Sequence, residues 1–74
     1  MKLLIETFDD NGNLNTSRTS TQNEPNWEKL EKKAKKYGRK TKFEKQNGEV
    51  VRYEEELNSK VLGIKKYIIT VIEK

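Results

Sequence analysis

The sequence predicts an α+β fold in which a single helix packs on one face of a mostly antiparallel sheet. Apolar residues concentrate near the two ends of the chain, at Leu3–Phe8 and Val61–Ile72. One segment between them repeats its apolar residues with helical spacing, and two Asn-Gly pairs mark tight turns between extended segments. Two layers are the simplest arrangement of such elements, so we expect residues 1–74 to form a single small domain.

The first predicted hairpin joins Leu3–Phe8 to Leu14–Thr21. Between them stands Asn11-Gly12, a strong hairpin signal because a type I′ turn requires positive φ at both central positions. The second segment is rich in Thr and Ser and lacks the apolar residues that fix a register. It is either an edge strand or a loop, so the order of elements is β-β-α-β-β-β with a strand here and β-α-β-β-β without one.

A helix is predicted in the middle of the chain, because four apolar residues recur at spacings of three and four: Trp27, Leu30, Ala34 and Tyr37. We expect Asn23 to cap its first turn and Pro25 to lie within that turn. Gly38 follows the last apolar residue, where a left-handed conformation ends many helices.

The C-terminal half reads as a hairpin followed by a final strand. Lys40–Lys45 alternates, with Thr41 and Phe43 on one side, and Val50–Glu56 returns after a second Asn-Gly turn. Val61–Glu73 has many β-branched residues and is apolar on both faces near its end, which predicts a central strand covered on both sides. A C-terminal helix is the alternative, and the β-branched residues count against it.

Most aromatic residues are expected in the core rather than at a binding surface. The set with helical or inward strand positions is Trp27, Tyr37, Phe43 and Tyr53. Exposed aromatic rings among cations stack bases in single-stranded nucleic acid, but a domain this small needs its large apolar side chains inside. Tyr67 is the expected exception.

The acidic run Glu54–Glu56 is interpreted as a solvated strand edge that prevents sheet-to-sheet aggregation. A strand places consecutive residues on opposite faces, so at most two of these carboxylates can cooperate in binding a cation. Pairing with the basic segment inside the fold is the other interpretation.

The composition argues against several classes of function. Without Cys or His there is no disulfide, no thiolate metal site and none of the commonest general bases. No nucleophile–base pair or phosphate-binding glycine loop is present, so we expect no enzyme, catalytic residue, metal or cofactor. No apolar run approaches a membrane span or a signal peptide, and we expect a cytoplasmic protein that does not bind membranes.

Charge is the most informative feature for function. The segment Lys29–Lys45, called the basic window below, holds nine basic and two acidic residues and therefore carries +7, whereas the whole chain carries +4. Such a concentration of positive charge selects anionic partners. Within it, Glu28–Lys32 and Glu31–Lys35 have the spacing of ion pairs within a helix.

The leading prediction is a small protein that contacts nucleic acid, or another polyanion, through its backbone with little sequence specificity. The residues expected to bind are Lys29, Lys33, Lys36, Arg39, Lys40, Lys42 and Lys45. One alternative is a regulator, either an inhibitor or an adaptor, that docks an acidic partner protein or adds Leu14–Thr21 to a partner's sheet. Another is a homodimer that buries apolar surface from Ile64–Ile72. A third interpretation is that the lysines only keep the protein in solution.

Overall fold

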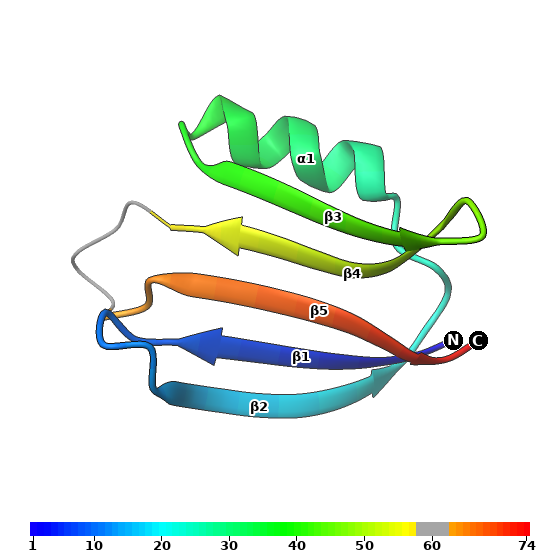
Figure 1. Ribbon diagram of the computed structural model, residues 1–74, viewed down its shortest axis with the longest axis horizontal. Helices are drawn as coiled ribbons and strands as arrows, with labels where there is room; N and C mark the ends of the chain where they lie inside the picture. Colours follow the sequence, from blue (N-terminus) through cyan, green and yellow to red (C-terminus); the bar gives the residue numbers. More distant parts are fainter. Residues whose placement is uncertain (58–62) are drawn as a thin grey trace.

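The computed structural model describes residues 1–57 and 63–74 and has one helix packed with a five-stranded antiparallel sheet (Figure 1). The elements follow the order β1 (Lys2–Phe8), β2 (Leu14–Thr21), α1 (Trp27–Lys36), β3 (Lys40–Gln46), β4 (Glu49–Glu56) and β5 (Lys66–Glu73). The predicted α+β fold and the order β-β-α-β-β-β are confirmed. The Ser/Thr-rich segment is a strand and not a loop.

The strands lie in the order β2-β1-β5-β4-β3, so the first and last strands of the chain are neighbours in the middle of the sheet. Ile69 of β5 lies opposite Ile5 of β1 on one side and opposite Tyr53 of β4 on the other. The β1–β2 hairpin lies on one side of β5 and the β3–β4 hairpin on the other, so β2 and β3 form the two edges of the sheet (Figure 1).

The core lies between the centre of the sheet and α1. Its buried residues come from three neighbouring strands and are Leu3, Ile5, Tyr53 and Ile69. Ala34 of α1 is fully buried, and Trp27 and Leu30 pack against this cluster from the helix. The helical spacing of these three residues therefore correctly identified the face of α1 that is removed from water.

The predicted aromatic core is confirmed in part. The ring of Tyr53 lies 5.2 Å from that of Phe43 and 6.2 Å from that of Trp27, measured between centroids, and both pairs are tilted. Tyr37 is 56% exposed, so its predicted core position is wrong, because the helix ends before it and it becomes the C-cap. Tyr67 is half-buried against the core and is not the exposed exception.

The helix starts later than the sequence predicted. Asn26, not Asn23, is the N-cap, and its Oδ1 accepts a hydrogen bond from the backbone N–H of Lys29 at 3.1 Å. A helix capped by Asn23 would need helical geometry at Glu24. Pro25 disfavours that geometry in the residue before it, so the helix starts after the proline. Gly38 has φ of +71° just past the helix end, as predicted.

The two Asn-Gly turns differ. Asn47 and Gly48 both have positive φ, 54° and 80°, as a type I′ hairpin turn requires. At the first turn only Gly12 has positive φ, so the predicted type I′ geometry is wrong there. Instead the Asp9 carboxylate accepts hydrogen bonds from the backbone N–H groups of Asn11 and Asn13, each at 2.9 Å. This carboxylate organises a longer loop that the Asn-Gly pair alone did not indicate.

The last strand is central but shorter than predicted. It begins at Lys66, whereas positions 61 and 62 of the predicted Val61–Glu73 strand lie outside the described residues. Ile68 and Ile69 point to opposite faces and both are buried. In the described part of the chain no second layer covers the face away from α1, called the reverse face below, so the prediction of double coverage is wrong. Neighbouring side chains shield Ile68 there, because it lies between Glu6 of β1 and Glu54 of β4.

Candidate functional site

The outer face of α1 carries the most concentrated uncompensated charge in the described part of the chain. At 100° per residue, four lysines fall within an arc of about 100° centred opposite the buried side of the helix. We call them the lysine row: Lys29, Lys32, Lys33 and Lys36. All four are exposed, and within residues 1–57 and 63–74 none of them forms an ion pair. Their ammonium groups are therefore available to an anionic partner.

The helix carboxylates lie on a different side. Glu28 and Glu31 line a cleft between α1 and the β3–β4 hairpin, together with Trp27, Phe43 and Lys45. Glu31 forms the predicted ion pair with Lys35 at 3.5 Å. The other predicted pair, Glu28–Lys32, is not formed in the part of the chain that the structure describes. The lysine row consequently contains no acidic side chain, whereas Lys45 lies among acidic ones.

Arg39, the next residue of the basic window, is used inside the fold. Its Nη1 lies 3.7 Å from Oε2 of Glu55, and its guanidinium sits 5.2 Å from the ring centre of Tyr37. The other carboxylate oxygen of Glu55 accepts a hydrogen bond from the hydroxyl of buried Tyr53 at 3.2 Å. Arg39 thus anchors the chain at the end of α1 to the middle of the sheet.

Lys40 and Lys42 lie on the reverse face of the sheet. They stand directly opposite Glu56 and Glu54 of β4 in the strand register. Opposite charges at facing positions of an antiparallel pair attract one another, so a carboxylate faces each of these lysines, although neither forms an ion pair among the described residues. The predicted edge role of Glu54–Glu56 is wrong, because β4 lies inside the sheet between β5 and β3.

Glu54 is the centre of this charge network. Its carboxylate lies 2.9 Å from the Nζ of Lys66 and 3.9 Å from Nη1 of Arg52. The hydrogen bond from Lys66 and the surrounding positive charges lower the pKa of Glu54 below its usual value, against a smaller opposing effect of burial. Glu54 therefore remains ionised at neutral pH and stabilises the cations around it.

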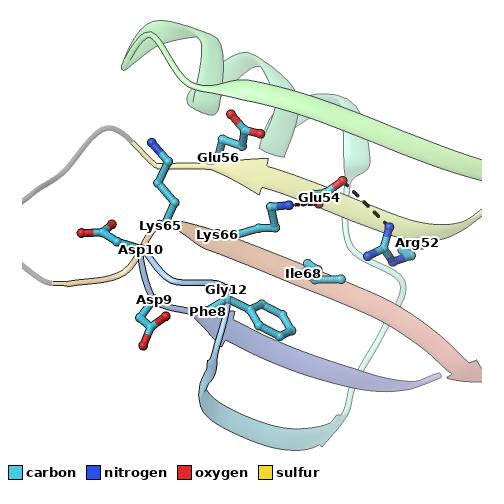
Figure 2. Close-up of a pocket in the computed structure, with 10 residues that line it drawn as sticks. All are labelled: Phe8, Asp9, Asp10, Gly12, Arg52, Glu54, Glu56, Lys65, Lys66 and Ile68. Carbon is cyan, nitrogen blue, oxygen red and sulfur yellow. Dashed lines mark ion pairs between the residues drawn. The ribbon is translucent and has the colours of Figure 1, made fainter.

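The structure also has a cavity that the sequence did not indicate (Figure 2). It occupies about 390 Å³ at one end of the reverse face, with Phe8 and Ile68 among its lining residues. In Figure 2 the Glu54 carboxylate lies between Lys66 and Arg52. The lining as a whole has four acidic and three basic residues and a formal charge of −1, so the cavity offers little attraction for an anionic ligand. Its residues come from β1, β4, β5, the first loop and Lys65 just before β5, and only the fold brings them together.

The structure divides the seven predicted binding residues among four places. Lys29, Lys33 and Lys36 share the outer face of α1, where Lys32 joins them. The other four predicted residues lie elsewhere: Arg39, Lys40, Lys42 and Lys45. Alternation along β3 places Lys40 and Lys42 on the opposite face from the inward-facing Phe43. This sequence pattern already indicated that the basic window does not form one continuous surface.

Among the described residues no three Cys, His, Asp or Glu side chains gather closely enough to hold a metal ion. The helix found in that part of the chain is too short and too polar to cross a membrane. Comparison with protein-family models, curated proteins and solved structures finds no match to this chain.

Proposed function

We propose that this is a non-enzymatic protein of the cytoplasm that binds nucleic acid through the lysine row of α1, by contacts to phosphate groups and with little sequence preference. The observation that supports it is a row of four exposed lysines on a rigid helix, with no acidic residue among them. Each phosphate that such a lysine neutralises releases condensed counterions, which drives binding. Lysine reads base edges less often than arginine, asparagine or glutamine, which favours backbone contact.

The dimensions of the row suit this role. Lys29 and Lys36 are seven residues apart, which corresponds to about 10 Å along a helix axis. That length corresponds to about three phosphates of one strand in a duplex. Buried Ala34 and the N-cap at Asn26 hold α1 on the sheet, so the lysines bind without ordering their backbone.

This site is narrower than the basic window. Lys40 and Lys42 face carboxylates on the reverse face, and Lys45 lies beside Glu28 and Glu31. In this proposal these three lysines contribute little, although they account for as much formal charge as Lys29, Lys33 and Lys36. They are therefore a charge-matched control for Lys29, Lys33 and Lys36, three of the four lysines in the row.

The test is fluorescence anisotropy with labelled single- and double-stranded oligonucleotides over a range of salt concentrations. Replacing three of its four lysines in K29Q/K33Q/K36Q should weaken binding at least tenfold and reduce the slope of log affinity against log salt by about 2 to 3. The control K40Q/K42Q/K45Q, which also changes the net charge from +4 to +1, should stay within twofold of the unmodified protein.

Three outcomes would overturn the proposal. The first is the absence of binding by the unmodified protein at low salt. The second is an equal loss in both triple variants, which would mean that net charge and not the lysine row determines affinity. The third is a loss confined to the control. Circular dichroism of each variant establishes that the affinities are compared between folded proteins.

A further inference from the structure

We propose that the free edge of β2 pairs with β2 of a second copy of this chain, so that two protomers share one continuous antiparallel sheet. β2 is an edge strand of eight residues, paired only with β1 among the elements that the structure describes. Seven of its residues are exposed, and it contains neither lysine nor proline. Arg18 is its one charged residue, and the one irregularity in its pairing with β1 lies near Leu14, away from the stretch from Ser17 to Thr21.

The register identifies which backbone groups of β2 point outward. The N–H of Gln22 donates to the C=O of Met1 at 2.9 Å, which makes these two residues a hydrogen-bonded pair. Hydrogen-bonded and non-hydrogen-bonded pairs alternate along an antiparallel ladder. Lys2–Thr21, Leu4–Thr19 and Glu6–Ser17 are therefore non-hydrogen-bonded pairs. It follows that the N–H and C=O groups of Ser17, Thr19 and Thr21 point away from β1.

This outward pattern is self-complementary. A two-fold axis at Thr19 places Thr19 opposite Thr19 of the second copy and Ser17 opposite its Thr21. All three outward residues of each copy then become hydrogen-bonded pairs, and hydroxyl side chains face each other across the junction, a favourable arrangement in sheets. Arg18 lies opposite Ser20 in this register, so no like charges meet directly.

The charge distribution does not oppose a second copy at this edge. Residues 1–21 contain two basic and three acidic residues and carry −1, whereas residues 22–74 carry +5. The lysine row belongs to α1, which packs beside β3 at the opposite side of the sheet (Figure 1). The other free edge, β3, carries Lys40, Lys42 and Lys45, and these lysines oppose head-to-tail pairing of β2 with β3.

A second copy suits this edge better than an unrelated peptide does. Edge-binding domains select a peptide through pockets for alternate side chains. The side chains of β2 are mostly short hydroxyls that are exposed to solvent, and they offer no apolar pocket. A single pair of strands also falls short of the roughly 1,000 Å² that a stable interface needs, so the dimer is expected to be weak and concentration-dependent.

The experiment is sedimentation equilibrium of the full chain at protein concentrations from about 20 μM to about 1 mM. T19P removes the outward N–H at the proposed axis, and a proline is tolerated on an edge strand where its nitrogen faces solvent. T19A keeps that N–H and is the matched control. We expect a dimer that T19P weakens at least tenfold and T19A changes by less than twofold.

A monomer at every concentration would overturn the proposal, and so would a dimer that T19P leaves unchanged or that T19A weakens equally. Amide hydrogen exchange of the unmodified chain gives a second, mutation-free reading. The N–H groups of Ser17, Thr19 and Thr21 should exchange more slowly at high than at low protein concentration. Exchange rates that do not depend on concentration would reject the pairing even if T19P failed to fold.

Discussion

The hydroxyl of Tyr53 connects the core to the charges at the surface. Tyr53 is only 1% exposed, and its O–H donates to Glu55, which in turn pairs with Arg39. Burial, first, and then the nearby Glu55 carboxylate raise the pKa of Tyr53 well above its ordinary value. Alternation along β4 predicted that Tyr53 is inside, but no pattern in the sequence indicated that Arg39 and Glu55 would meet beside it.

The raised pKa of Tyr53 makes stability sensitive to alkaline pH. The folded state holds the phenolic proton more tightly than the unfolded chain, so this contribution is complete below the ordinary pKa of about 10 and is lost as pH rises above it. We expect Y53F to lose about 1 kcal/mol of unfolding free energy at pH 7, because the hydrogen bond to Glu55 disappears. Above pH 10 Y53F should decline less steeply than the unmodified protein. Urea denaturation measures both effects, and identical alkaline profiles would contradict the assignment.

Glu54 provides the corresponding test in acid. Its pKa is lowered in the folded state, so its stabilising effect is present above the unfolded pKa, about 4.3, and is lost as pH falls through the lower folded value. We expect E54Q to cost about 1 kcal/mol of unfolding free energy at pH 7 and little at pH 3. The control E44Q removes the more exposed partner of Arg52 and should cost less than about 0.5 kcal/mol. A cost of E54Q that is independent of pH would show that the ion pair with Lys66 is not its source.

At the scale of single elements, α1 was predictable in its existence and its buried face but not in its start. Apolar spacing identified Trp27, Leu30 and Ala34, and these residues do pack inward. Both Asn23 and Asn26 are suitable caps by residue type, and a proline stands between them. The restriction that Pro25 places on Glu24 decides between them, and the observed cap lies after the proline.

The two asparagines give a direct test of the helix start. N26A removes the side chain that accepts the Lys29 N–H, and we expect it to lower the unfolding free energy by about 1 kcal/mol. N23A should change it by less than about 0.5 kcal/mol, because Asn23 is exposed and lies outside the helix. Thermal denaturation of the two variants side by side distinguishes them. A larger loss in N23A would return the cap to the position that the sequence suggested.

The basic window shows how an element redistributes charge that is continuous in the sequence. A helix gathers residues three and four apart, so the lysine row lies on one face of α1. A strand sends alternate residues to opposite faces, so Lys42 and Lys45 of β3 lie on different sides of the sheet. The helical half of the window could thus be predicted as a surface. The partners of the other half depend on β4, whose position next to β3 exposes Lys40 and Lys42 to Glu56 and Glu54.

At the scale of the whole molecule, the two hairpins follow from local signals but their arrangement does not. Asn47-Gly48 specifies that β3 and β4 pair, because the turn geometry is local. The pairing of β1 with β5 joins residues from opposite ends of the chain, such as Ile5 and Ile69, and no local signal encodes it. This long-range pairing leaves β2 at one edge and carries the hairpin beside α1 to the other. It therefore separates the lysine row from the free edge of β2.

That separation predicts that the two proposed surfaces act independently. Sites that share no contacts have additive effects, so T19P should leave binding to an oligonucleotide of about 10 nucleotides within twofold of the unmodified protein. Conversely, K29Q/K33Q/K36Q should dimerise with the same dissociation constant as the unmodified protein.

A dimer has two lysine rows, and a strand long enough to reach both binds more tightly because its second contact is intramolecular. Only on such long strands should T19P weaken binding.

Anisotropy with a short and a long oligonucleotide, measured above the dimerisation constant, tests this independence. We expect T19P to match the unmodified protein on the short strand and to bind the long strand several-fold more weakly. A loss on the short strand would mean that β2 itself touches nucleic acid, which would merge the two surfaces into one. If T19P also matches the unmodified protein on the long strand, the two lysine rows of a dimer do not engage one strand together, because pairing through β2 holds them too far apart.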